Sequence, residues 1–287
     1  MPLEESPPTT HAVSMSTASL RRPYKMAFID LDDTLLGPDK AIGRANLRAL
    51  KRLRRAGVQI AIASGRHHRN ITAMNQIGDQ EWVLSSHGSV VRHHRTGEVL
   101  AERNLDPSIA RPLCTRGDKL GFSVIVYHRD GPFIEHDSDW IQLYARGAGW
   151  MPERTDFTSL DPSGFQKVIW SAHPEQIAQC APALKAEFVD QANVLVTNPE
   201  LLEFFSIAAN KAVGAQTLAR KLEIRSEETL AFGDGNNDVE LLRWAGVSVA
   251  MNHGRETARR AARFVSPPGP PESAFARAVD LTLATAG

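Results

Sequence analysis

The sequence predicts an α/β protein, in which an inserted α+β domain interrupts a doubly wound, Rossmann-like core of parallel strands. Short apolar runs alternate with helical patterns over residues 24–87, and the same alternation returns over 206–287. Such alternation with short links is typical of a parallel sheet covered by helices. Ser64 and Lys211 lie about 150 residues apart, whereas a parallel crossover unit needs only roughly 30. A domain-sized insertion therefore fills the interval, and we place it at 88–205.

The first part of the core is expected to hold three strands and two helices. Residues 25–31, 58–64 and 81–86 are short apolar runs without a helical period, as in buried parallel strands. Residues 41–57 carry leucines three apart and end at a glycine, which is a helix stop signal. A second helix is expected near 66–77.

The inserted stretch has a mixed pattern. Residues 89–102 predict a hairpin with its turn near Thr96-Gly97. Further strands are expected at 121–127, 131–136 and 165–172, then a helix at 173–188 and an adjacent strand pair at 193–199 and 201–207.

Simple alternation resumes in the last third of the chain. Turn-rich links, including the proline-rich stretch 266–271, separate its elements. Helices are expected at 210–223, 238–246, 255–262 and 273–284, with strands at 228–234 and 247–251.

The composition is that of an ordinary globular chain. The 33 Lys and Arg residues balance 33 Asp and Glu residues, so nucleic-acid binding through net charge is not supported. The chain has no run of about 18 apolar residues and so predicts no membrane helix. Cys114 and Cys180 predict free thiols in a reducing compartment, which indicates the cytoplasm. Residues 1–23, rich in Ser, Thr and Pro, are expected to be a disordered leader whose role the sequence does not reveal.

Carboxylates follow two of the predicted strands. Asp30 and Asp32 come directly after the first strand, at the edge where open α/β sheets bind ligands. Such a pair can divide the work of nucleophile and acid/base, although an acidic turn or a helix cap explains it as well. Asp234 and Asp238 lie in "FGDGNND" and, with Asp30, offer the oxygen ligands that suit Mg²⁺. A turn with Asp238 as a helix cap is the alternative.

Two further polar segments lie at a predicted strand end and a helix start. The hydroxyl of Ser64 and free N–H groups near Gly65 can hold an anion, or Ser64 is simply a helix N-cap. Lys211 can offset the charge of a carboxylate and a phosphoryl group, or it is a solvated surface residue. For Ser64 and Lys211 alone the structural alternative is favoured, and for the segment of Asp234 alone the two alternatives are balanced. The combination of four segments in this order is far more specific.

These segments resemble the motifs of a known enzyme superfamily. "DLDDTLL", "ASGR", "NK" and "AFGDGNNDVELL" are similar to the four motifs of the haloacid dehalogenase-like (HAD) phosphatases, and the resemblance covers about residues 24–265. The position of the insertion resembles the Cof-type branch, whose members carry a mobile α/β cap there. The resemblance thus implies a catalytic core with a cap domain.

The resemblance also implies a mechanism that rests on positioning and charge neutralisation. Asp30 would attack phosphorus and form a phosphoaspartate, and Asp32 would protonate the leaving alcohol and then activate water. The other implied roles are phosphate binding by Thr34, Ser64, Gly65 and Lys211, and Mg²⁺ binding by Asp30, the backbone carbonyl of Asp32, Asp234 and Asp238, with Asn237 in support.

Some residues differ from the family pattern, and others have two possible roles. Asp33 stands where the family often has Gly, and His87 where the branch often has Asn. His87 is either a substrate contact at the hinge into the cap or a structural turn residue, and Arg66 either caps a helix or approaches substrate. The pairs His67-His68 and His93-His94 are expected on the surface, because adjacent residues do not readily face one metal.

The favoured function is Mg²⁺-dependent hydrolysis of a small phosphorylated metabolite, such as a sugar phosphate. A phosphotransferase or a sugar-phosphate mutase on the same scaffold is the alternative. A ligand-binding module on a spent scaffold is disfavoured, because every key polar residue is present. The sequence does not identify the substrate, nor does it distinguish a monomer from a homodimer.

Overall fold

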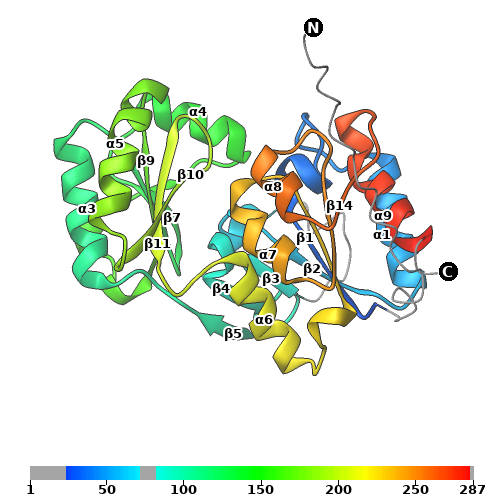
Figure 1. The fold of residues 1–287 in the computed structure, drawn as a ribbon. Coiled ribbons are helices and arrows are strands. Elements are labelled where there is room, and N and C mark those ends of the chain that lie inside the picture. Colours follow the sequence, from blue (N-terminus) through cyan, green and yellow to red (C-terminus); the bar gives the residue numbers. More distant parts are fainter. Residues whose placement is uncertain (1–23, 72–81, 285–287) are drawn as a thin grey trace, which may run out of the picture.

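The computed structural model describes residues 24–71 and 82–284, which are organised around two sheets (Figure 1). The larger sheet has eight strands in the order β14-β13-β12-β1-β2-β3-β4-β5, and the smaller has six in the order β10-β11-β9-β6-β7-β8. The predicted class, an α/β core with an inserted mixed domain, is confirmed. The predicted leader 1–23, and residues 72–77 of the helix expected near 66–77, lie outside the described residues. Residues 66–71 of that helix form only a short 3-10 turn at His68–Asn70.

Six neighbouring strands of the larger sheet are parallel and form the core. The apolar runs of all but the edge strand β14 are buried on both faces, as the sequence indicates. They are β1 (Met26–Ile29), β2 (Gln59–Ala63), β3 (Trp82–Ser85), β12 (Thr229–Gly233), β13 (Val247–Ala250) and β14 (Phe264–Val265).

Helices cover both faces of this sheet (Figure 1). Alternate residues of β1 point to opposite faces: Ile29 packs with the cluster under one helix pair, and Phe28 packs with the cluster under the other helices. The first face carries α1 (Arg44–Arg55) and α9 (Ala274–Ala284), and the second carries α6 (Lys211–Lys221), α7 (Val239–Trp244) and α8 (Glu256–Ala261). The helices predicted in the last third of the chain are thus confirmed.

The predicted hairpin of residues 89–102 forms as β4 (Val90–His93) and β5 (Val99–Glu102). It lies within the range predicted for the inserted domain, yet β4 pairs antiparallel with β3 and extends the core sheet. The sequence pattern shows a hairpin but not the sheet it joins. We therefore propose that the chain leaves the core after Glu102 and returns after Ser206, and we call residues 103–206 the insert.

The smaller sheet belongs to the insert, and its strands are mostly antiparallel. Only β7 and β8 pair in parallel. The strands are β6 (Ser123–His128), β7 (Gly131–Ile134), β8 (Glu153–Arg154), β9 (Phe165–Ser171), β10 (Ala192–Val196) and β11 (Leu201–Ser206).

The two faces of the insert sheet differ. The outer face packs against α3 (Pro107–Lys119) and α5 (Pro174–Glu187), with the fully buried Trp170 at its centre. The inner face carries α4 (Asp139–Ala148) and turns toward the core (Figure 1). Side chains of the inner face therefore meet the carboxyl ends of the core strands. No helix among the described residues is long and apolar enough to span a membrane.

Candidate active site

Asp30 lies at the carboxyl end of the central strand β1. Its backbone N–H donates to the carbonyl of Phe232 on β12, which holds the start of the loop against the neighbouring strand. The loop then turns back at Asp33, whose φ of 56° is in the left-handed region. This turn brings the hydroxyl of Thr34 to the Asp234 carboxylate, to which it donates at 3.0 Å. The first and fourth motifs thus meet, as predicted from parallel strand ends.

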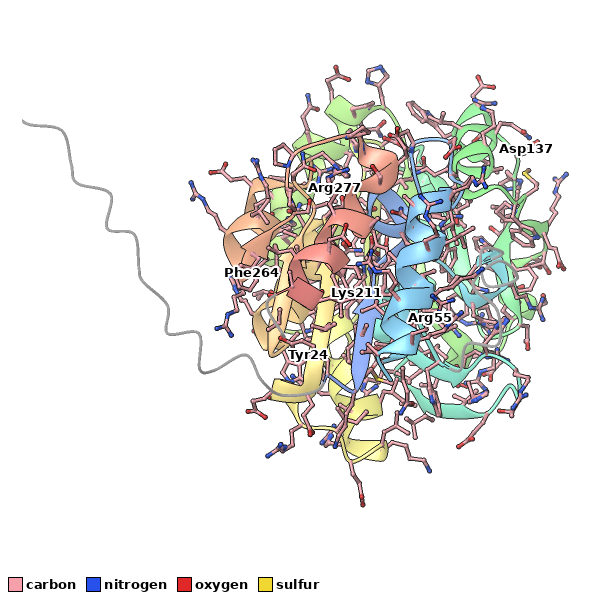
Figure 2. All side chains as sticks on the ribbon, turned by 90° about the vertical axis from the view of Figure 1, so that its right-hand side faces the viewer. Tyr24, Arg55, Asp137, Lys211, Phe264 and Arg277 are labelled. Atoms are coloured by element: carbon pink, nitrogen blue, oxygen red, sulfur yellow. The ribbon has the colours of Figure 1, made fainter. Side chains whose placement is uncertain are left out.

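Lys211 occupies the first turn of α6, and its side chain is wholly buried near the centre of the molecule (Figure 2). The side chain of Asn210 caps the helix by accepting from the N–H of Val213. The Nζ of Lys211 contacts Asp30 at 2.5 Å and Asp238 at 2.6 Å. The surface alternative for this lysine is therefore wrong.

Asp238 fixes the loop that follows β12. One of its carboxylate oxygens accepts from the N–H groups of Asp234 and Gly235, at 3.1 and 2.9 Å. A β-carbon at Gly233 would lie 2.5 Å from the Asp238 carboxyl carbon, so a glycine is needed there. Asp238 thus orients the loop and pairs with Lys211. It precedes α7, but its side chain makes no capping hydrogen bond to that helix.

Two buried carboxylates, Asp30 and Asp238, and the partly buried Asp234 form a cluster with excess negative charge. Asp30, Asp234 and Asp238 each offer one oxygen, and these atoms lie within 4.8 Å of one another. Burial raises the pKa of Asp30 well above its usual range; Lys211 opposes this shift, while Asp238 and Asp234 add to it. Burial and the nearby Asp238 raise the pKa of Asp234 to about 7. One ammonium faces three carboxylates, so the cluster has the charge and the oxygen donors that suit a divalent cation.

Ser64 and Gly65 follow β2 on the neighbouring side of Asp30. Ser64 is buried, and its Oγ accepts from the N–H of Arg66 at 3.1 Å in a local turn. The alternative of a helix N-cap is wrong, because the short 3-10 helix that follows is capped by His67. A β-carbon at Gly65 would lie 2.5 Å from the His87 ring, so this position also requires a glycine. Gly65 lines the same cavity as Asp30.

Asp32 is paired with cations. The guanidinium of Arg66 donates to both of its carboxylate oxygens, at 2.8 and 2.7 Å, and Lys40 lies at 3.2 Å. Burial raises the pKa of Asp32, but Arg66 and Lys40 outweigh it, so the net shift is downward. Arg66 also donates to the carbonyl of Ala148, at the end of α4, at 2.7 Å. Arg66 is therefore not a helix cap; it links an acid of the core to the insert.

A cavity of about 240 Å³ lies between the core strand ends and the inner face of the insert. Concave sites of this kind are where proteins usually bind small molecules. Its lining includes the core residues Asp30, Asp32, Gly65, Arg66 and Asp234, and the insert residues Tyr127, Tyr144, Lys167, Thr197 and Glu203.

His87 does not line this cavity. It is buried, stacks on Phe205, and donates from Nε2 to Glu203 at 2.5 Å. On its other side, Asn237 donates to its Nδ1 at 3.4 Å. In this structure the histidine is therefore a contact between core and insert, in line with the structural alternative.

Sequence reasoning missed the charged residues of the insert. Lys167 and Glu203 each interrupt an otherwise apolar strand, "FQKVIWS" and "LLEFFS". A single charge within a buried strand is unusual and was the available signal. Both side chains are nearly inaccessible and both line the cavity.

His67 lies just after β2. His67 was expected on the surface, but it is buried and donates from Nε2 to the carbonyl of His128 at 3.0 Å. Burial lowers its pKa to about 2, so the ring is neutral. The surface prediction for His67 was wrong because the insert covers this segment of the core.

Asp33 keeps an exposed side chain, and its carbonyl accepts from His253 at 2.7 Å.

Comparison with known proteins identifies the family. The family model of the haloacid dehalogenase-like hydrolases matches residues 27–273. The chain is 27% identical over 230 residues to the HMP-PP phosphatase of Cronobacter sakazakii, covering 80% of this chain and 84% of that protein. The chain belongs to the haloacid dehalogenase-like hydrolases, and it is a phosphatase-type enzyme of that family.

Solved structures share the whole architecture. A haloacid dehalogenase-like hydrolase from Bacteroides thetaiotaomicron superposes with a TM-score of 0.79 at 25% identity, over 90% of this chain and 99% of that one. A HAD subclass IIB sugar phosphatase superposes with the same TM-score at 20% identity, over 91% and 99% of the chains, and it supports the fold alone. The predicted resemblance to the capped Cof-type branch is confirmed.

Proposed function

We propose that the protein is a Mg²⁺-dependent phosphatase that hydrolyses a small phosphorylated metabolite through a phosphoaspartate on Asp30. The observation that carries this proposal is the buried cluster in which Lys211 bridges Asp30 and Asp238 beside Asp234. The relatives with phosphatase names support the reaction class. We expect the substrate to be a cytoplasmic phosphomonoester, such as a sugar phosphate.

The two carboxylates after β1 divide the chemistry. A carboxylate oxygen of Asp30 attacks phosphorus, the bond from phosphorus to the ester oxygen breaks, and Asp32 gives a proton to the leaving oxygen. Water then attacks the phosphoaspartate, Asp32 takes its proton, and inorganic phosphate leaves with Asp30 restored. The ionised Asp32 of this structure is in the form needed for the second step. The first step requires a protonated Asp32, so its contact with Arg66 must weaken.

The remaining residues bind and orient. Ser64 and the Gly65 N–H would bind the phosphoryl oxygens, and Gly65 lines the cavity. Lys211, which contacts Asp30, would offset the charge of that carboxylate and of the phosphoryl group. Thr34 holds Asp234 in place. Mg²⁺, when bound, neutralises phosphate oxygens that an anionic nucleophile approaches. The residues that would hold it are Asp30, Asp234, Asp238 and the backbone carbonyl of Asp32, with Asn237 supporting the loop.

Phosphate release from a panel of about a hundred phosphomonoesters tests the proposal. We expect turnover of some members with Mg²⁺, and its loss on chelation and in Asp30→Asn. Asp33→Asn is the matched control, because Asp33 is an exposed acid of the same loop and Asn tolerates its left-handed φ. Turnover that resists chelation and survives Asp30→Asn contradicts the mechanism. Transfer of phosphate to another hydroxyl, with no release of inorganic phosphate, would instead favour the phosphotransferase or mutase alternative.

A further inference from the structure

The inner face of the insert carries a second buried charge cluster, which the proposed reaction does not use. Lys167 on β9 donates to Glu203 on β11 at 2.7 Å, and His87 of the core donates to the same carboxylate oxygen at 2.5 Å. The other carboxylate oxygen of Glu203 accepts from the hydroxyl of Thr197 at 2.9 Å. We call Lys167 and Glu203 the insert pair.

Burying the charges of the insert pair costs free energy. Lys167 is 1% exposed and Glu203 is 5% exposed. Removing two charges from water costs several kcal/mol per ion, and apolar replacements of buried pairs are often as stable. Burial raises the pKa of Glu203, but the attraction of Lys167 and His87 outweighs it and lowers that pKa to about 2, so the carboxylate is ionised. A retained ion pair at a cavity wall is a candidate for recognition.

The insert pair lies next to the phosphate side of the cavity. The Nζ of Lys167 donates to the carbonyl of Gly65 at 2.9 Å, one residue after Ser64. Lys167 and Glu203 line the same cavity as Asp30 and Asp234. A phosphoester held at Asp30 therefore places the first atoms of its leaving group toward the inner face of the insert.

The hydrogen-bonding capacity of the pair is nearly, but not fully, used. An ammonium has three protons, and Lys167 gives two of them to Gly65 and Glu203, above the Tyr127 ring at 4.4 Å. No third oxygen acceptor for it lies among the residues that the structure describes. A carboxylate accepts about four hydrogen bonds, and Glu203 receives three. One proton of Lys167 and one lone pair of Glu203 therefore have no hydrogen-bond partner among the described residues.

We propose that Lys167 and Glu203 are the specificity-determining residues for the leaving group, and that they bind a hydroxyl next to the phosphoester. A hydroxyl accepts one hydrogen bond and donates one, which matches the unused donor of Lys167 and the unused acceptor of Glu203. The insert pair thereby selects hydroxylated leaving groups over apolar ones of the same shape. This inference rests on the proposed function of the same cavity, because it assumes a phosphoester bound at Asp30.

Binding to the catalytically inactive Asp30→Asn protein tests the inference without depending on turnover. The probes are 2-hydroxyethyl phosphate and its isostere propyl phosphate, each titrated by calorimetry with Mg²⁺ present. We expect the hydroxylated ester to bind at least about tenfold more tightly, as befits a hydrogen bond to charged groups. Adding Lys167→Met together with Glu203→Gln removes both charges and leaves neither unpaired. In that protein we expect the preference to fall to about one.

The control is Lys185→Met, an exposed lysine of the insert on α5, which should keep the preference. Equal binding of the two esters, binding of neither, or a preference that survives the double substitution would overturn the inference. A merely structural role would weaken both esters equally and leave their ratio unchanged. Failure of the proposed function is detected by a different measurement, the phosphate-release assay, in which turnover would persist in Asp30→Asn.

Discussion

Two buried lysines sit among carboxylates in this molecule, and their charge balances differ. In the core, Lys211 faces the three acids Asp30, Asp234 and Asp238, and burial with mutual repulsion raises the pKa of Asp30 and of Asp234. In the insert, Lys167 faces a single acid, Glu203, whose pKa is lowered. The core cluster is therefore built to receive positive charge, whereas the insert pair is already neutral and suited to hold a neutral polar group.

Lys211→Met should show the largest effect, because it makes the core cluster still more negative. We expect phosphate release to fall roughly 10³-fold or more, as when a group that stabilises transition-state charge is removed. Phosphate release with Mg²⁺ measures this, and circular dichroism checks that the variant is folded.

Lys167→Met sharpens the comparison with Lys211→Met. Both substitutions leave a buried carboxylate without its lysine and should destabilise the protein by about 3–5 kcal/mol. Only Lys211→Met should nearly abolish turnover. The control is Lys221→Met at the exposed end of the same helix α6. A similar loss of turnover in both buried variants would remove the distinction between the clusters.

Mg²⁺ should stabilise the native protein through the core cluster alone. At a hundredfold excess over its dissociation constant, an ion that binds only the folded state adds about 2.7 kcal/mol to the free energy of unfolding. For a chain of this length that raises the Tm by roughly 5 °C. Differential scanning fluorimetry with and without Mg²⁺ measures the shift.

Two variants assign the Mg²⁺ effect to one cluster. Asp234→Asn replaces a core carboxylate with a neutral amide and should eliminate most of the protection, whereas Glu203→Gln, in the insert, should keep it. Equal protection of native protein and Asp234→Asn would show that Mg²⁺ binds elsewhere.

The core site was predictable because its signals are local in sequence. The apolar runs of β1 and β12 end at Asp30 and Asp234, and parallel pairing of the two strands brings those ends together. Each segment alone allowed a structural alternative, and only the four segments in this order favoured an active site. The left-handed turn at Asp33 was not predicted. Asp is one of the residues enriched at positive φ, and the glycine that the family often has at this position was the available signal.

The insert pair was not predictable in the same way. Lys167 and Glu203 lie on strands whose pairing sets Lys167 opposite Phe205 and Glu203 opposite Ile169, so they are diagonal neighbours only after the sheet forms. His87 reaches Glu203 only after the insert docks on the core. Arg66 likewise finds Asp32 and Ala148 through tertiary packing. Such contacts depend on register and docking, which a single sequence does not specify.

The smallest effect expected is a change in the acid stability of the insert pair. Glu203 has a pKa of about 2 in the folded state, below its usual value of 4.5. The unfolded state therefore takes up a proton that the folded state does not, and the stabilisation present above pH 4.5 is lost as pH falls. Between pH 6 and pH 3.5 this loss is about 1 kcal/mol. Glu203→Gln should lack it.

Urea unfolding at the two pH values measures this difference. Native protein should lose about 1 kcal/mol more than Glu203→Gln on acidification, although the variant is less stable at both pH values because Lys167 has lost its partner. Glu187→Gln is the control, since Glu187 is an exposed insert acid paired with Arg116. Identical pH slopes in native protein and Glu203→Gln would mean that Glu203 titrates normally. The charges of the insert pair would then not be shown to balance. The difference between the insert pair and the core cluster would rest on geometry alone.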